Sequence, residues 1–309
     1  MQLRAYWGRL AEAIAQFLED HRVLSFSFFS LFYFLGAFGA AVSKPFWFDE
    51  LLSWYTARLP SFIDIWNALM EGIQPNPPIS YFLIHISHWL FGTGELVTRL
   101  PFIIGFWLTL LLLFILVSRR FGSLMGYISI LFLCLGVSYQ YAFEARPYAL
   151  VLAFCCSSLL CWQLAIEGRV RRLALVGLTL SLSAALFSHF NAILIFVPIM
   201  VGEAYRSLRS GKIDWPIWIS MAFGAMTLIP LIPMLLGLRP FSEIFWSKPT
   251  KGNFYEAINW FYGDPILVCF LVGGCLIEFL IMGRSVTTQV KNKLAVWGLP
   301  SHELAVVIT

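Results

Sequence analysis

Repeated long apolar segments constrain this chain more than any other feature of its sequence. A helix needs about 20 apolar residues to cross a hydrocarbon layer of roughly 30 Å. Hydrophobic residues make up 59% of the 309 residues and charged residues only 12%, whereas soluble domains contain roughly 25% charged residues. Hydropathy and periodicity predict eight membrane spans. They cover residues 23–42, 97–117, 123–141, 147–166, 173–187, 190–202, 215–238 and 265–283.

The expected fold is therefore an all-α, polytopic transmembrane bundle that forms one membrane domain, residues 23–283. Residues 1–22 are too polar for a signal peptide, but their apolar residues recur at helical spacing, which predicts an amphipathic helix lying at the cytoplasmic membrane interface. The apolar segment 79–91 has only 13 residues, so we expect an interfacial or re-entrant helix there. Residues 284–309 read as a polar cytoplasmic tail.

Clusters of basic residues predict which loops face the cytoplasm. Under the positive-inside rule, the clusters at 119–120, 169–172, 206–212 and 284–293 are cytoplasmic, and an even number of spans must separate each pair. Eight spans satisfy this condition and leave 14 of the 21 Lys and Arg residues inside and 7 outside. The predicted external loops are 43–96, which holds the short interfacial helices, and 142–146, 188–189 and 239–264.

Other classes of site are disfavoured by what the chain contains. Its six cysteines all fall in apolar segments, where they read as small packing residues rather than as disulfide or zinc ligands. The net charge of +4 comes from scattered basic residues that match no nucleic-acid-binding motif. We therefore expect lipid and small-molecule partners, with no nucleic acid among them.

Ionisable residues gather in the predicted external loops. Asp49 and Glu50 stand among aromatic residues in "FWFDE", Glu144 and Arg146 in "FEARPY", and His189 in "SHFN". Ionised groups near hydrocarbon cost several kcal/mol unless they are paired or line a wet cavity. Carboxylates, an arginine and a histidine on one face of an apolar bundle are what an active site at the membrane surface requires.

Simpler structural roles exist for the same residues. The two acids of "FWFDE" would stabilise the N-terminus of a helix beginning near Leu51. The glutamate and arginine of "FEARPY" would form an ordinary ion pair, with Pro147 starting the next helix. The histidine of "SHFN" would be a structural hydrogen-bond donor, and Arg99, shortly before Pro101, would anchor the second span at the lipid headgroups.

Several motifs together resemble the GT-C superfamily of polytopic glycosyltransferases that use lipid-linked sugars. "FWFDE", "PNPPISYFLIH", "RLP", "FEARPYAL" and "SHFNAIL" occur in that family's order over residues 46–264. The chain is most similar to glycosyltransferase family 39 and the protein O-mannosyltransferases, whose relatives include bacterial aminoarabinose transferases. Family members usually continue through more spans, so the polar tail suggests a truncated or minimal module.

The resemblance implies transfer of a sugar from a polyprenyl-phosphate donor to a hydroxyl of a protein, lipid or glycan, with inversion at the anomeric carbon. Asp49 would be the general base, and Glu50 would orient Asp49 or the acceptor, or help Asp49 hold a divalent cation. Arg146 would bind the donor phosphate, and Asn76, Glu144 and His189 are further candidate substrate contacts. The site would face the periplasm, exterior or lumen from a bacterial inner or plasma membrane, or from that of the ER.

Two other functions fit a polytopic, aromatic-rich chain. A transporter of lipid-linked saccharides would place ionisable residues along a path through the membrane core, whereas here they are expected at one surface. A truncated relative of a transferase would be a non-catalytic membrane partner. The external loop 239–264 alternates basic and aromatic residues, which is typical of an interfacial belt and would also suit a lid over a sugar phosphate.

Overall fold

The computed structural model describes residues 13–168, 170–238, 252 and 256, and every regular element in these ranges is a helix. The all-α prediction is therefore confirmed. Residues 13–20 are helical and lead towards α2. The elements in chain order are α2 (Arg22–Ser43), α3 (Phe48–Ala57), α4 (Phe62–Met70), α5 (Ile79–Phe91), α6 (Glu95–Phe121), α7 (Ser123–Leu135), η1 (Val137–Ala142), α8 (Tyr148–Ile166), α9 (Arg171–Ser188), η2 (Phe190–Ile195), α10 (Phe196–Ser210), α11 (Trp215–Met226), η3 (Ile229–Leu231) and α12 (Ile232–Gly237).

Six helical segments within the described residues are long and apolar enough to cross a membrane, so the predicted number of about eight spans is not confirmed. Each of the six overlaps a predicted span, and the short helix α5 is not among them. The predicted span 123–141 is divided, because α7 ends after 13 residues at the extended backbone of Gly136 and η1 follows. At 1.5 Å per residue α7 is roughly 20 Å long, too short to cross alone. The six segments are Arg22–Ser43, Glu95–Phe121, Tyr148–Ile166, Arg171–Ser188, Phe190–Ser210 and Trp215–Gly237.

Several predicted segments lie outside the described residues. They are most of the N-terminal interfacial helix, the external loop 239–264, the span 265–283 and the polar tail 284–309. Their assignments remain predictions.

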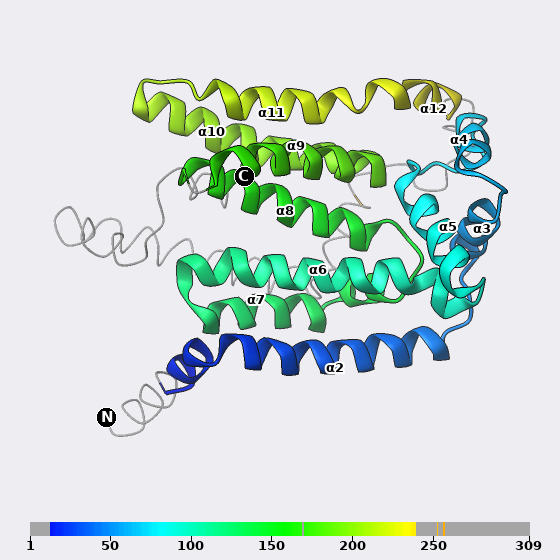
Figure 1. The fold of residues 1–309 in the computed structure, drawn as a ribbon, viewed down its shortest axis with the longest axis horizontal. Helices are drawn as coiled ribbons and strands as arrows, with labels where there is room; N and C mark the ends of the chain where they lie inside the picture. The colour runs from blue at the N-terminus through cyan, green and yellow to red at the C-terminus, as the bar shows by residue number, and fades with distance from the viewer. Residues whose placement is uncertain (1–12, 169, 239–251, 253–255, 257–309) are drawn as a thin grey trace.

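The bundle has two different ends (Figure 1). The long helices run side by side, and the short helices α3, α4 and α5 gather at one end, on the right of the figure. We call this the site end; the loop between η1 and α8 and the start of η2 also lie there. The end of α6, the start of α9 and the turn between α10 and α11 lie at the opposite end, called the basic end below. By the bounds of these helices, this end holds Arg119, Arg120, Arg171, Arg206 and Lys212.

Helix α6 is the central support of the site end. It packs against α2, α5, α7 and α8, and Tyr33 of α2 donates a 2.7 Å hydrogen bond to the backbone oxygen of Ile103 in α6. Helices α6 and α8 approach closely at Gly105, where an added Cβ would lie 2.8 Å from Leu150. Close packing fixes the ends of these helices relative to one another, and it is from their ends that the site is built.

Candidate functional site

Glu50 is the buried member of the acidic pair. Its side chain is 0% exposed and lies in the first turn of α3. Arg99 of α6 donates from Nε to Oε1 and from Nη2 to Oε2, both at 2.8 Å. The backbone N–H of Ala145 donates to Oε1 at 2.7 Å and that of Trp47 to Oε2 at 3.0 Å. Each carboxylate oxygen of Glu50 therefore accepts two hydrogen bonds and has little capacity for a substrate.

These contacts keep Glu50 ionised. Burial opposes its ionisation, but the guanidinium of Arg99 and the N–H groups of Trp47 and Ala145 outweigh burial and lower the pKa of Glu50. The bond from the Trp47 N–H also caps α3. Glu50 is the third residue of the helix, and its side chain accepts from the residue that precedes the helix. Helix α3 begins at Phe48, and Glu50 lies in its first turn. The helix-capping role considered above for the acidic pair is therefore the role of Glu50.

Arg99 joins three segments of the site end. Its side chain is 0% exposed, and besides binding Glu50 it donates from Nη1 to the backbone oxygens of Ala41 at 2.5 Å and Lys44 at 2.6 Å. Nη2 also reaches the oxygen of Pro45 at 3.2 Å. The expectation that Arg99 anchors its helix at the lipid headgroups was wrong. Its guanidinium is buried because it binds the carboxylate of Glu50 and the backbone carbonyls at the end of α2. It fixes the position from which α3 starts.

Asp49 differs from its neighbour in both exposure and partners. Its side chain is 50% exposed, and its Oδ2 lies 3.2 Å from Nη2 of Arg146. No other side chain in the described ranges donates a hydrogen bond to this carboxylate. Successive residues of a helix point about 100° apart, so the contacts that bury Glu50 direct Asp49 outward. Of the acidic pair, Asp49 is therefore the carboxylate with room to accept a proton.

Arg146 is held between acidic and aromatic groups. Nη1 lies 3.8 Å from Oε2 of Glu144, and Nη2 donates to the Tyr148 hydroxyl at 3.4 Å, with the guanidinium 5.0 Å from the centre of that ring. Lys44 forms an ion pair with the other oxygen of Glu144. Lys44, Glu144, Arg146 and Asp49 thus form a row of alternating charge. The two cations share one nearly buried carboxylate, so an added anion would meet positive charge from both.

His189 closes the row on the side of η2. Its ring packs 5.5 Å from that of Tyr148, and its Nδ1 accepts a 3.0 Å hydrogen bond from the backbone N–H of Asn191. Because Nδ1 is an acceptor, a neutral ring carries its proton on Nε2. Burial and the positive charge of Arg146 both lower the pKa of His189. The ring is therefore a neutral donor beside the arginine.

Asn76 lies on a neighbouring polar surface rather than in this row. Its side chain lies near the hydroxyl of Tyr81, and that hydroxyl donates to Oε1 of Gln74 at 3.5 Å. Burial and the nearby charge of Asp49 raise the pKa of Tyr81. Nε2 of Gln74 is buried and has no hydrogen-bond partner among the described residues. An unsatisfied donor of this kind requires explanation, and a ligand hydroxyl would provide one.

The acidic pair does not form a cation site in this conformation. Glu50 is buried and uses both oxygens for four hydrogen bonds, whereas Asp49 is half exposed and pairs with Arg146. Within the described ranges, no group of three or more His, Cys, Asp and Glu side chains is arranged to hold a metal ion. The observed donor set therefore fits proton transfer and anion binding better than cation binding.

Sequence reasoning did not single out Lys44, Tyr148 or Gln74. Lys44 is the first charged residue after the first span, Tyr148 stands in "FEARPY", and Gln74 is two residues before Asn76. These positions beside recognised motifs were the available signal. Their relevance depends on partners far away in the chain, such as residue 144 for Lys44.

The comparison with protein families gives one match. The family model described as dolichyl-phosphate-mannose-protein mannosyltransferase matches residues 75–236, which are 162 of the 309 residues. The matched range includes Asn76, Glu144, Arg146 and His189, and it begins after Asp49. Neither the curated proteins nor the solved structures gave a match.

Proposed function

The chain belongs to the dolichyl-phosphate-mannose-protein mannosyltransferase family, and we propose that it transfers a sugar from a polyprenyl phosphate to a hydroxyl acceptor. The reaction would take place at the site end, which would face away from the cytoplasm, and would invert the anomeric carbon. The observation that carries this proposal is the open ion pair of Asp49 and Arg146 beside the closed pair of Glu50 and Arg99.

Arg146 is the proposed ligand of the donor phosphate. A guanidinium has five N–H donors and binds phosphate oxygens in a bidentate manner. Arg146 keeps partial exposure at 26%, and its contacts with Asp49 and Glu144 are longer than those within the buried pair. Its sequestered partner Glu144 is already neutralised by Lys44. A phosphate can therefore enter the row without leaving a buried carboxylate unpaired.

Asp49 is the proposed general base. The acceptor oxygen attacks the anomeric carbon as its proton passes to a carboxylate oxygen of Asp49, and the bond between that carbon and the phosphate oxygen breaks. The electron pair of that bond leaves with the polyprenyl phosphate, whose negative charge Arg146 stabilises. Binding of phosphate to Arg146 would also weaken its hold on Asp49, which would free the base when the sugar donor is present.

Glu50 acts in this proposal as a positioning residue. Through Arg99 it ties α3 to the end of α2 and to α6, and through Ala145 it ties α3 to the loop that carries Arg146. One buried carboxylate thus sets the separation between the proposed base and the proposed phosphate ligand. We place His189 as a neutral donor to the sugar or phosphate, and Asn76 with Gln74 as acceptor contacts.

A transfer assay tests the function. Purified full-length protein is incubated with a radiolabelled polyprenyl-phosphate sugar and with peptide, lipid or glycan acceptors, and we expect label to move to an acceptor. Vesicles that carry the same donor provide the second arm. Movement of the intact donor across the bilayer with no transfer would identify a transporter. Binding with neither transfer nor movement would identify a non-catalytic partner.

Cysteine labelling tests the proposed orientation. Glu71 at the site end and Ser210 at the basic end are both exposed, so a cysteine at either place is accessible from its own side. A membrane-impermeant maleimide added to intact cells should label Glu71→Cys and not Ser210→Cys. The parent protein supplies the background from its native cysteines, and reversed labelling would place the site end in the cytoplasm.

A further inference from the structure

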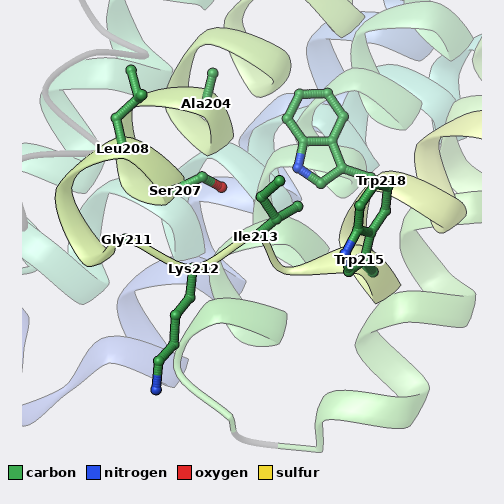
Figure 2. A pocket seen from close by; sticks show the side chains of 8 residues that line it. All are labelled: Ala204, Ser207, Leu208, Gly211, Lys212, Ile213, Trp215 and Trp218. Atoms are coloured by element: carbon green, nitrogen blue, oxygen red, sulfur yellow. The ribbon is translucent and has the colours of Figure 1, made fainter.

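A groove lies at the basic end between the end of α10 and the start of α11, far from the site end (Figures 1 and 2). Its cavity volume of about 610 Å³ is within the range of small-ligand sites, roughly 300 to 1,000 Å³. It shares no residue with the proposed active site. The lining residues are Ala204, Ser207, Leu208, Gly211, Lys212, Ile213, Trp215 and Trp218.

The groove is mainly apolar and opens outward. Leu208 is 84% exposed, Trp215 63% and Ile213 55%, although α10 and α11 both belong to membrane-spanning segments. Large apolar side chains at the end of a span contact lipid, and tryptophan is typical of the level of the lipid headgroups. Hydrocarbon chains of the surrounding leaflet therefore have direct access to this groove.

One edge of the groove carries an uncompensated positive charge. Lys212 is exposed and forms no ion pair with any described residue. The nearest acid in sequence, Asp214, is already bound by Arg171 at 2.5 Å and Arg206 at 2.6 Å. The two arginines thus neutralise the carboxylate of Asp214, and the ammonium group of Lys212 remains available to an anion from the membrane.

A third feature is an unsatisfied hydroxyl in the wall. Oγ of Ser207 is withdrawn from solvent and has no hydrogen-bond partner in the described part of the chain, and Figure 2 shows it directed from α10 towards Ile213. Buried polar atoms are normally hydrogen-bonded. An ester or phosphate oxygen of a lipid seated in the groove would accept from this hydroxyl.

We propose that this groove binds one anionic phospholipid from the leaflet at the basic end. The phosphate would lie against Lys212, an oxygen near the glycerol would accept from Ser207, and the acyl chains would cover Leu208 and Trp215. Basic pockets between transmembrane helices are suited to anionic headgroups. A soluble anion would gain the charge but leave the apolar wall uncovered, whereas a phospholipid satisfies both.

Native mass spectrometry of the detergent-solubilised full-length protein measures this binding with two probes, phosphatidylglycerol and phosphatidylcholine of identical acyl chains. We expect phosphatidylglycerol to bind about fivefold more tightly, the effect of one lysine near an anionic surface. Lys212→Gln should abolish this preference, and Lys212→Arg should retain it. Trp215→Ala should weaken the binding of both lipids.

Arg172→Gln is the matched control, because it removes one exposed positive charge from the same end without touching the groove. This variant should keep the preference for phosphatidylglycerol. Equal binding of the two lipids to the parent protein, or an equal loss in Lys212→Gln and Arg172→Gln, would overturn the proposal. A protein dimer that forms in place of the lipid complex would overturn it as well, by identifying a second copy as the occupant.

Discussion

The two ends of the bundle use similar residues in different ways. At the basic end Glu167 and Asp214 are each shared by two arginines; Glu167 accepts from Arg119 at 2.6 Å and from Arg120 at 2.8 Å. At the site end Glu50 is equally saturated, but its neighbour Asp49 is half exposed and has one contact at 3.2 Å. The difference indicates that closed networks hold the helices in place, while an open ion pair retains the capacity to exchange its partner for a substrate.

Replacing the exposed acid should have the largest effect on function. Asp49→Asn keeps the size of the side chain but cannot take up a proton at neutral pH. If Asp49 is the general base, turnover should fall roughly 10²-fold to 10⁴-fold, while binding of the sugar donor stays largely intact. The measurement is transfer of radiolabelled sugar by folded, purified variant protein, with donor binding measured on the same sample.

Glu167→Gln is the control at the basic end and should leave turnover near that of the parent protein. Near-parental transfer by Asp49→Asn would remove Asp49 as the base, since asparagine caps a helix about as well as aspartate. Loss of binding and transfer together would instead assign Asp49 to recognition of the sugar donor.

The second prediction contrasts the buried acid with the acid at the basic end. Glu50→Gln leaves the guanidinium of Arg99 buried without a countercharge, and the free energy of unfolding should fall by about 3 to 5 kcal/mol. Glu167→Gln should cost about 1 kcal/mol or less, because its pair is partly exposed and water can replace the lost contacts. Thermal and denaturant unfolding in detergent compare the two. Equal losses would contradict the distinction.

The pH dependence of unfolding provides a second readout for Glu50. Its pKa is lowered in the folded protein, so its stabilising contribution is complete above the unfolded value, about 4.3, and is lost as the pH falls further. The parent protein should therefore lose stability below about pH 5 more steeply than Glu50→Gln does. Parallel slopes would mean that Glu50 does not titrate differently in the folded state.

A third, smaller effect is expected for binding at Arg146. Loss of a charged hydrogen-bonding group costs about 1.5 to 3 kcal/mol, so Arg146→Ala should weaken binding of the polyprenyl-phosphate sugar by roughly tenfold to 150-fold. Arg146→Lys should be intermediate, because lysine keeps the charge and loses bidentate geometry. Arg171→Ala at the basic end is the control. Unchanged affinity in both Arg146 variants would exclude this residue from the phosphate site.

The extent of the apolar segments was enough to predict the main helices, because the thickness of the hydrocarbon layer fixes their length. Six predicted spans have a matching apolar helix, and the 13-residue segment that became α5 was too short to count as a span. The segment 123–141 was harder, since its composition is mostly apolar on both sides of Gly136, while its backbone leaves the α conformation at that residue. A glycine within an apolar run does not reveal by sequence alone whether the helix ends there.

The roles of adjacent acids were also beyond local sequence. Asp49 and Glu50 share the same flanking residues, and their different environments arise because Arg99 approaches from 49 positions away and meets only one of them. Contacts between distant parts of the chain therefore determine which of the two acids is buried. Motif order was sufficient to nominate Arg146, His189 and the acidic pair, whereas Lys44 gains its place in the charged row from contact with Glu144, 100 positions away.

The smallest expected effect concerns His189, the neutral member of the site end. Burial and Arg146 lower its pKa, so its neutral form stabilises the fold fully above the unfolded value, about 6.5, and that contribution is lost as the pH falls. Protonation would remove the Nδ1 acceptor of the Asn191 N–H, a hydrogen bond of about 1 kcal/mol. An asparagine places its Oδ1 where Nδ1 lies, accepts the same bond and does not titrate. Between about pH 7 and pH 5.5 the His189→Asn protein should therefore lose less stability than the parent protein. The pKa of His88 is lowered too, but His88 is the same in the parent protein and in the His189 variant. The difference between the unfolding temperatures of these two proteins therefore reports His189. We expect a difference of a few degrees that opens only on the acid side; a constant offset at all pH values would mean that His189 is not kept neutral by its position beside Arg146.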